Sequence, residues 1–381
     1  MKFVIAPDSY KGSLTSREAG EIIARAIQQE IPESETRVIP MADGGEGTVE
    51  ALLAAAGGEK VRVRAAGSLG DAVETFYGII ERDGERTAVI EVANICGLTM
   101  MPPEPRNPMH TTTRGIGEVI GDALNRGIRS FVIGLGGSAT NDGGLGMLNA
   151  LGVRYVSGDG KVLAGFGREL AEVARVDVGG LDPRIGECRI TIACDVTNPL
   201  LGENGATYVY GPQKGAGHED LAMLEQAMAR YADVAEAGFA RVCRDMPGAG
   251  AAGGLGFALM LLGGQVVPGA QVIEQMTGLS HHIAEADWII TGEGRSDGQT
   301  LFGKLPIHVA RLAKAAGKPV ILISGSLGPG SEQLNDCFTA CFAIVRGPAS
   351  LEECMHDAAS NLYECTRQVA RLIHRVSGSE P

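Results

Sequence analysis

The most constraining feature of the sequence is a strand–helix alternation that occurs at both ends of the chain and is interrupted between them. Two βα units begin at residues 2–6 and 37–41, and three short β-rich runs return at 288–291, 319–324 and 341–345. Alternation of this kind is typical of parallel sheets. The five runs together predict one five-stranded parallel sheet, assembled from the two ends of the chain. The first helix is predicted to open at the capping-box pattern Thr15-x-x-Glu18, and one final helix is predicted from about residue 351 to 374.

The stretch between these ends follows a different pattern. Runs at 60–66, 75–81 and 87–92 are joined by short turns without helices, which predicts a β-meander. Helices and strands then alternate irregularly up to about residue 286. Helices are predicted near 114–125, at 218–239 and from Gly253 onward. We therefore expect an α/β protein in which a second, different α/β domain, residues 61–285, is inserted into a discontinuous first domain of residues 1–60 and 286–381.

Composition excludes several classes of protein. An apolar fraction of 44% with 21% charged residues is ordinary for a folded soluble protein, and the net charge of −13 argues against a general nucleic-acid or anionic-membrane binder. The apolar N-terminal run ends at Asp8 and Lys11, too early for a signal peptide, and the eight cysteines form no CxxC pair. We expect a cytoplasmic protein that neither binds nucleic acid nor spans a membrane.

Glycine is unusually frequent, and some of it occurs in a repeated motif. There are 55 glycines, roughly twice the usual share of ~7%. The run Asp43-Gly44-Gly45-Glu46-Gly47 recurs as Asp142-Gly143-Gly144-Leu145-Gly146, and Gly253-Gly254-Leu255-Gly256 repeats it without the aspartate. Each run precedes or opens an apolar helix, where unpaired N–H groups suit an anion. The alternative is close packing of three helix starts; the anion interpretation is somewhat favoured.

Polar residues follow most of the predicted strands. Because ligands of parallel sheets bind outside the carboxyl ends of the strands, these residues would gather at one edge of each sheet. Lysines and amides there suit phosphate, and carboxylates suit Mg²⁺ or an alcohol proton, so the pattern favours phosphoryl transfer with Mg²⁺ rather than zinc. The segments are Asp8–Lys11, Asp43–Glu46, Glu293–Lys304 and Ser324–Ser326 in the first domain, and Gly136–Asp142, Cys194–Pro199 and Tyr210–Gly215 in the second.

A competing nucleotide signature is weaker. No GxxxxGK[ST] or protein-kinase motif occurs, but Gly134-x-Gly136-x-x-Ala139 after a strand fits the dinucleotide fingerprint. The residues that follow it delay the expected helix, and no acidic strand end lies about 20 residues further on. A nicotinamide-dependent enzyme is therefore the weaker alternative to phosphoryl transfer.

Seven ordered motifs resemble the type 1 family of bacterial glycerate kinases along essentially the whole chain. They are APDSYKGS from Ala6, ADGGEGT from Ala42, GGSATNDGG from Gly136, ACDVTNPL from Ala193, GPQKGA from Gly211, PGAGAAGG from Pro247 and TGEGRSDGQTLFGK from Thr291. The resemblance implies a flavodoxin-like domain that carries an inserted α/β domain, with the active site between them. It also implies ATP-dependent phosphorylation of D-glycerate, generally to 2-phosphoglycerate. The alternatives that remain for such a substrate are an NAD(P)-dependent hydroxyacid dehydrogenase and a non-catalytic hydroxyacid-binding protein. Ser296 and Gly298, on either side of Asp297, depart from the family pattern.

With this resemblance we assign expected roles to single residues. The catalytic group is Asp195 as the base, with Lys11 and Asp297, and the Mg²⁺ ligands are Asp43 and Glu293. The residues expected to bind substrate or nucleotide are Ser9, Gly44, Gly45, Ser138, Asn141, Asp142, Asn198, Gln213, Lys214, Arg295 and Lys304. The sequence leaves open which domain holds the nucleotide, which hydroxyl is phosphorylated and whether the chain forms a homo-oligomer.

Overall fold

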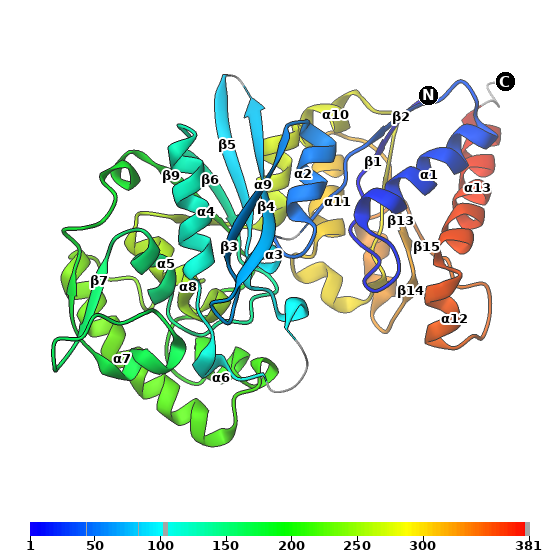
Figure 1. Ribbon diagram of the computed structural model, residues 1–381. Helices are drawn as coiled ribbons and strands as arrows, with labels where there is room; N and C mark the ends of the chain where they lie inside the picture. The colour runs from blue at the N-terminus through cyan, green and yellow to red at the C-terminus, as the bar shows by residue number, and fades with distance from the viewer. Residues whose placement is uncertain (43, 83, 102–105, 378–381) are drawn as a thin grey trace. The chain divides into compact units, whose positions relative to one another are not determined.

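The computed structural model describes residues 1–42, 44–82, 84–101 and 106–377, and the chain divides into two compact units (Figure 1). Unit 1 comprises residues 1–43, 50–57 and 270–381, and unit 2 comprises residues 44–49 and 58–269. The main borders lie at 57/58 and 269/270, compared with the predicted positions near 60 and 286. Helix α10 (Leu279–Glu285) falls with unit 1 because it packs against α11 and β1 of that unit.

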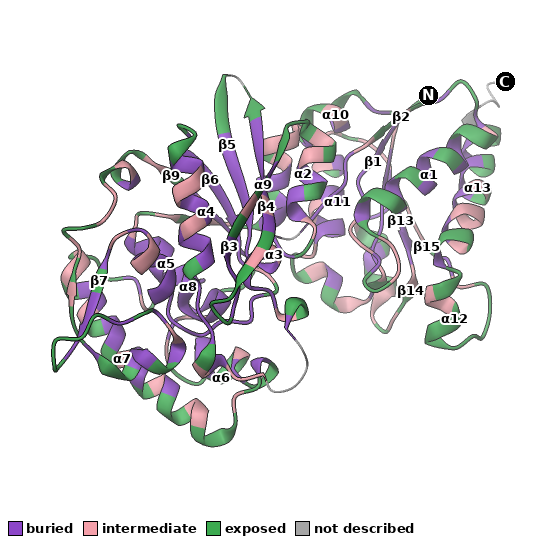
Figure 2. Ribbon diagram, viewed as in Figure 1, coloured by how far each residue is buried: buried purple, intermediate pink, exposed green. Residues whose placement is uncertain are grey.

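Unit 1 contains the predicted five-stranded parallel sheet, which is confirmed. Its strand order is β15-β13-β11-β1-β2, the flavodoxin-like order, with β1 between β11 and β2. The central strands are buried along most of their length, as expected for a sheet covered on both faces (Figure 2). The strands are β1 (Lys2–Ile5), β2 (Glu35–Val38), β11 (Trp288–Thr291), β13 (Val320–Ser324) and β15 (Ala340–Ala343), with a small parallel pair, β12 (Arg295–Ser296) and β14 (Ser326–Leu327).

Helices on the two faces of this sheet complete unit 1. Helix α1 (Ser16–Glu30) opens with the predicted capping box at Thr15 and Glu18, and it shares a core with Phe3, Ile5 and the C-terminal helix α13 (Ala358–Ser377). Helices α10 and α11 (Leu305–Ala315) contact the strands as well. The remaining helices are α2 (Thr48–Ala56), which starts in unit 2, α9 (Gly269–Thr277) and α12 (Leu351–His356).

Unit 2 is built on a six-stranded mixed sheet in the order β10-β9-β6-β5-β4-β3. The predicted meander is confirmed as three antiparallel strands, and β5, β6, β9 and β10 run parallel. A second core of aromatic and aliphatic side chains includes Tyr155, Tyr231 and Phe257. The ring of Tyr231 contacts the rings of both Tyr155 and Phe257. The strands are β3 (Glu59–Ala66), β4 (Ala72–Arg82), β5 (Glu85–Glu91), β6 (Ser130–Gly134), β9 (Arg189–Ala193) and β10 (Gln265–Val267), with β7 (Arg154–Ser157) and β8 (Val173–Asp177) as a separate pair.

The helices of unit 2 follow the predicted positions at several places. Helices α4 (Arg114–Asn125) and α7 (His218–Phe239) have the predicted bounds. Helix α8 (Ala251–Leu261) differs, because Ala252, Gly253 and Gly254 have positive φ and the regular helix starts only at Leu255. The others are α3 (Ala93–Cys96), α5 (Leu145–Ala150) and α6 (Ala206–Tyr210). No helix in the described part of the chain combines the length and apolar character needed to cross a bilayer.

Candidate functional site

Three of the predicted loops meet at the carboxyl ends of β6 and β9 in unit 2. Gly136 N–H donates to Gly44 O at 3.2 Å, and a Cβ at Gly136 would lie 2.4 Å from the Cα of Gly45. A Cβ at Gly44 would likewise lie 2.8 Å from the carbonyl oxygen of Ala193. Glycine is required here because the three backbones touch. The glycines Gly44 and Gly45 of ADGGEGT are therefore brought together with the segments GGSATNDGG and ACDVTNPL at this edge.

The loop from Gly44 to Val49 is held by a residue that the sequence did not suggest. Glu91, the last residue of β5, is fully buried. Its Oε1 accepts the Gly47 N–H at 3.0 Å, and its Oε2 accepts the Val49 N–H at 3.1 Å. These amides open helix α2, so a carboxylate of the chain itself already occupies this anion position.

At the second copy of the glycine motif, a carboxylate of the chain itself also accepts the free N–H groups. This corrects the anion interpretation at this position. The buried Asp142 carboxylate accepts the N–H groups of Thr113, Gly144 and Gly146 and the hydroxyl of Thr113, at 2.7–3.1 Å. Met147 N–H donates to Thr113 Oγ1 at 3.0 Å. Burial raises the pKa of Asp142, which these donors oppose. Asp142 thus builds the loop and has no oxygen left for substrate.

The third copy is closely packed for the same physical reason. A Cβ at Gly253 would lie 2.0 Å from the carbonyl oxygen of Thr140, and Gly143 N–H donates to Gly253 O at 3.0 Å. The two glycine runs therefore pack backbone to backbone. Close packing, rather than anion binding, explains the glycines of the second and third copies.

Lys214 lies deep beneath the Gly136–Asp142 loop. Its Nζ donates to Thr140 O at 2.6 Å and to Ser138 Oγ at 3.1 Å, and only 3% of the residue is exposed. Among the described residues no carboxylate forms an ion pair with it, and burial lowers its pKa to about 8. The predicted binding residues Ser138 and Lys214 are therefore in direct contact.

Polar atoms without partners accompany this lysine. Asn141 donates through Nδ2 to Thr207 Oγ1 at 3.2 Å, but its Oδ1 and the hydroxyl of neighbouring Thr140 are buried and have no hydrogen-bond partner among the described residues. Buried polar atoms of native proteins usually have hydrogen-bond partners. Two neighbouring atoms without such partners therefore point to a functional role for this loop.

Asp195 and Asn198 follow β9 at the same edge of unit 2. Asp195 is exposed, and its Oδ1 accepts the Gly269 N–H at 2.9 Å just after β10. Asn198 instead closes its own loop: it donates to Asn204 O at 2.8 Å and accepts from the Tyr210 hydroxyl at 2.6 Å. Gln213 is exposed beside Lys214. Asp195 is thus the more accessible of the two predicted residues.

In unit 1, the loops after β1, β11 and β13 meet in the same manner. Asp8 N–H donates to Gly292 O at 2.8 Å, Gly325 N–H donates to Glu293 O at 2.9 Å, and the buried Tyr10 hydroxyl donates to Ile323 O at 2.6 Å. This packing presents Ser9 and the exposed Lys11 at the carboxyl edge of the sheet. The sequence predicted this edge correctly but gave no role to Tyr10.

Glu293 is the centre of a hydrogen-bonded group in unit 1. Its Oε1 accepts the hydroxyls of Ser296 and Thr300, both at 2.8 Å, and its Oε2 lies 3.3 Å from Lys304 Nζ. Glu293 is buried, whereas 39% of the Lys304 side chain is exposed. The structure therefore unites the two predicted residues as an ion pair whose cation still faces solvent.

Asp297 and Arg295 lie next to this group. Asp297 Oδ1 accepts the Gln299 N–H at 3.0 Å, which starts the 3-10 turn Gly298–Phe302, and Oδ2 lies 3.6 Å from Arg295 Nε. Ser296, one of the two departures from the family pattern, uses its hydroxyl to bind Glu293. Arg295 remains largely exposed, as expected for a group that contacts a ligand.

The predicted Mg²⁺ ligands find little support in the described residues. Both oxygens of Glu293 are already engaged by hydroxyls and an ammonium group, so this carboxylate does not fit as a direct metal ligand. Asp43 lies outside the described residues. Within the part of the chain that is described, no three His, Cys, Asp or Glu side chains gather as a metal site.

The dinucleotide fingerprint does not produce its usual geometry. After Gly134-x-Gly136-x-x-Ala139 the chain continues as a loop, and α5 begins only at Leu145. The first amides of α5 are taken by Asp142 and Thr113. A pyrophosphate would find no open helix N-terminus at this motif.

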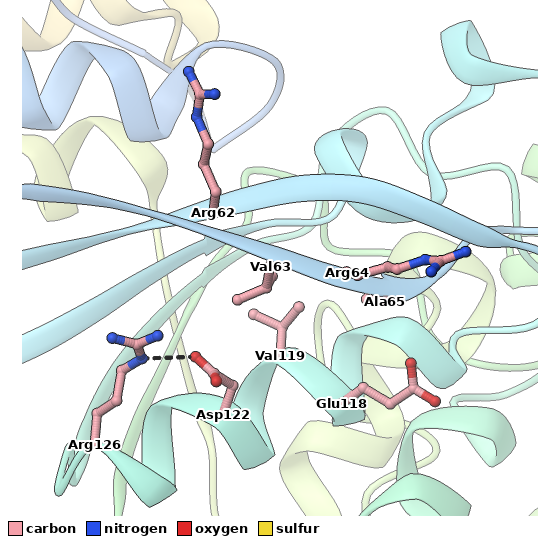
Figure 3. A pocket seen from close by; sticks show the side chains of 8 residues that line it. All are labelled: Arg62, Val63, Arg64, Ala65, Glu118, Val119, Asp122 and Arg126. Carbon is pink, nitrogen blue, oxygen red and sulfur yellow. Dashed lines mark hydrogen bonds and ion pairs between the residues drawn. The ribbon is translucent and has the colours of Figure 1, made fainter.

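A surface cavity of unit 2 is separate from these loops. It has a volume of about 250 Å³ and lies between β3 and α4 (Figure 3). Its carboxylates have partners already: Asp122 binds Arg126 and Tyr77, and Glu118 accepts the Ala66 N–H. None of the predicted site residues lines it.

Comparisons with known proteins agree over nearly the whole chain. A family model described as "Glycerate kinase family" matches residues 3–374. A glycerate kinase of Halalkalibacterium halodurans is 45% identical over 370 residues, which cover 96% of this chain and 97% of the relative. The glycerate 2-kinase of Escherichia coli K12 is 42% identical over 375 residues, 98% of each chain. A crystal structure described as a glycerate kinase 2, from Salmonella typhimurium LT2, covers 99% of each chain with a TM-score of 0.89 and 42% identity.

Proposed function

We propose, because this chain belongs to the glycerate kinase family, that it transfers the γ-phosphoryl group of ATP to D-glycerate and forms 2-phosphoglycerate. The chain is an enzyme, a phosphotransferase with an alcohol acceptor. The observation that carries the proposal is the match over residues 3–374, which includes every loop described at the two carboxyl edges.

Both units contribute groups to the proposed reaction. Unit 1 offers exposed cations, Lys11, Arg295 and Lys304, that suit phosphate oxygens. Unit 2 offers the exposed carboxylate of Asp195 and the buried cation Lys214. Unit 1 thus offers mainly cations, and unit 2 offers the exposed carboxylate that we propose as the base.

In the proposed step Asp195 acts as the general base. The proton of the reacting glycerate hydroxyl moves to the Asp195 carboxylate while the alcohol oxygen forms a bond to the γ-phosphorus. The bond from phosphorus to the β,γ-bridging oxygen breaks, and ADP leaves with that electron pair. The developing negative charge on the phosphoryl oxygens is stabilised by the cations of unit 1.

Magnesium remains a proposal that rests on the substrate rather than on the described residues. Mg²⁺ usually keeps several waters and binds through nucleotide phosphates and one or two carboxylates, where it would neutralise phosphate charge. We expect Asp43→Asn to weaken the apparent Mg²⁺ affinity. Glu293 is not proposed as a direct ligand because its oxygens are occupied.

The activity is tested by measuring ATP-dependent ADP release with D-glycerate, followed by enolase without phosphoglycerate mutase. Direct consumption of the product by enolase identifies the 2-phosphate, and a requirement for the mutase identifies the 3-phosphate. ADP release that no hydroxyacid stimulates would contradict the kinase proposal. A saturation-transfer NMR signal from NADH but not from ATP would favour the dehydrogenase. Binding of a hydroxyacid without turnover would favour a hydroxyacid-binding protein.

The base is tested with Asp195→Asn. Asparagine keeps an oxygen that can accept the Gly269 N–H, so the substitution removes proton acceptance and largely preserves the loop. We expect kcat to fall by about 10²–10⁴-fold while the Kd of nucleotide changes only a few-fold. A small loss of kcat would place the base elsewhere, with Asp297 as the next candidate, since Asp142 is committed to its loop.

A further inference from the structure

Glu91 is a buried carboxylate that joins the end of one strand to a loop of the candidate site. It is fully buried at the carboxyl end of β5, and its two oxygens accept the N–H groups of Gly47 and Val49. Burying an ionised carboxylate costs free energy unless donors replace its water. The two amides are such donors, and the pair of hydrogen bonds fixes both ends of a three-residue segment.

The segment that Glu91 fixes is continuous with the glycines that touch the other site loops. Thr48, between the two amides, donates its hydroxyl to Gly45 O at 2.7 Å, and Gly44 O accepts the Gly136 N–H. A Cβ at Gly134, Gly136 or Gly44 would collide with facing backbone at 2.4–2.8 Å. The facing backbones are therefore in close contact, so a shift of the loop would also shift the segments packed against it.

A displacement of this loop would therefore also displace the loops that carry the predicted reacting groups. Gly136 starts the segment that carries Ser138 and Asn141, and Ala193, against which Gly44 rests, lies two residues before Asp195. The ends of β5, β6 and β9 are thus tied together, one by a side chain and two by backbone contact. The carboxylate of Glu91 is a side-chain link between β5 and the Gly44–Val49 loop.

We infer that Glu91 is a positioning residue for the proposed glycerate phosphorylation: its carboxylate sets the place of the Gly44–Val49 loop and, through it, of the loops that carry Ser138 and Asp195. The inference rests on the proposed function for its catalytic consequence. The role of Glu91 in holding the loop does not depend on the proposed function, because it concerns only the hydrogen bonds within the chain.

Glu91→Gln is the substitution that tests it. Glutamine has the same size but offers one acceptor oxygen, and its Nε2 would face an N–H group, so one of the two hydrogen bonds is lost. Because a misplacement of about 1 Å can cost about 10²-fold in rate, we expect kcat/KM for glycerate to fall about 100-fold. We also expect KM of glycerate or of ATP to rise several-fold.

A control for the loss of negative charge is available in the same unit. Glu169 is also buried, but one oxygen, Oε2, accepts both backbone N–H groups, those of Gly165 and Phe166, at 2.7 and 3.0 Å. The oxygen of glutamine can keep both hydrogen bonds, so Glu169→Gln removes the charge of a buried carboxylate without removing a hydrogen bond. We expect it to lower Tm less than Glu91→Gln does, with KM unchanged and kcat/KM within a few-fold of wild type.

Hydrogen exchange separates the structural inference from the activity. In Glu91→Gln the amides of Gly47 and Val49 should exchange faster while the protection of α4 is unchanged. Faster exchange together with a KM change supports the inference. Unchanged exchange, or equal kinetic effects of Glu91→Gln and Glu169→Gln, overturns it. A wild-type protein that does not phosphorylate glycerate refutes the proposed function, while the exchange result still decides whether Glu91 holds the loop.

Discussion

Lys214 carries a buried positive charge that no carboxylate of the described chain neutralises by an ion pair. Burial lowers its pKa to about 8, so the ammonium group that holds Ser138 and the Thr140 carbonyl becomes neutral as the pH rises. We expect kcat/KM to fall as the pH is raised through about 8, because kcat/KM reports the free enzyme. Initial rates from pH 6 to 10 test this.

The matching substitution is Lys214→Arg, whose guanidinium does not titrate in this range. Its rate should be lower because the shape differs, but the alkaline limb near pH 8 should be absent. A limb that persists in Lys214→Arg would assign the titration to another group.

The lowered pKa of Lys214 also affects stability: the free energy of unfolding should rise with pH, whereas kcat/KM should fall. The pKa of Lys214 is below its unfolded value of 10.5, so between pH 8 and 10.5 the unfolded chain binds more protons than the folded one. The contribution of Lys214 to the free energy of unfolding is therefore unfavourable below pH 8 and fades as the pH rises to 10.5. Urea unfolding of wild type and Lys214→Met across this range should converge with rising pH.

At the residue scale the sequence predicted neighbours better than roles. It predicted that Ser138 and Asn141, in one loop, and Lys214, in another, all belong to the site. The structure brings Ser138 into contact with Lys214. The sequence also assigned Asp142 to substrate, whereas the carboxylate is consumed by Thr113 and nearby amides. Thr113 lies 29 residues before Asp142, and no local pattern links the two. Glu91 escaped prediction for the same reason.

Among the elements, the junction of β6 with the site loops allows a sharp substitution test. A Cβ at Gly136 would lie 2.4 Å from the Cα of Gly45. Gly136→Ala should displace the loop, lower the free energy of unfolding by about 1–3 kcal/mol and reduce kcat/KM by more than tenfold. Chemical denaturation and steady-state kinetics measure the two effects.

Helix α4 supplies the control for this substitution. Gly121 lies inside α4, and nothing is within 4 Å of the Cβ that alanine would add. Gly121→Ala should raise the free energy of unfolding by up to about 1 kcal/mol and leave activity unchanged, since alanine favours the helix more than glycine does. A loss of activity in both variants alike would contradict the packing argument.

Element prediction succeeded where periodicity is strong and failed where packing decides. Helices α4 and α7 and strand β11 have the predicted bounds. The final helix, predicted as one, is divided into α12 and α13, and the start of α8 is displaced by the backbone of Thr140 and Asn141 packed against Gly253. The three-residue strand β10 was not predicted, because its pairing with β9 is a long-range contact.

For the whole molecule, separate cores predict separate unfolding. Unit 1 and unit 2 each have a hydrophobic core, and Trp288, the single tryptophan, belongs to β11 of unit 1. We expect urea transitions followed by tryptophan fluorescence and by far-UV circular dichroism not to coincide. Tyr231→Ala in the unit 2 core should shift the dichroism curve and leave most of the fluorescence curve in place. Coincident curves for both proteins would show one cooperative unit.

At this scale the sequence was most informative about topology. The βα rhythm at the two ends predicted the five-stranded sheet, and the helix-free runs predicted the meander. It did not predict that Gly44–Val49 falls with unit 2 while the rest of α2 falls with unit 1. That division depends on Glu91 and on glycine contacts with Gly134 and Gly136, which are not visible in any local pattern.

The pairing of β1 with β11 also fixes an order of events during synthesis. Strand β1 ends at Ile5, and its partner begins at Trp288. At about 5–20 residues per second, a ribosome needs roughly 15–60 s to make the intervening chain. All of unit 2 emerges in that interval and can bury its own apolar residues, while β1 and α1 wait for β11. Strand β2, the other neighbour of β1, is made early, but the edge of β1 that pairs with β11 stays open for most of the time that the protein is being made. This apolar edge, Phe3–Ile5, is a segment that a chaperone at the ribosome could cover.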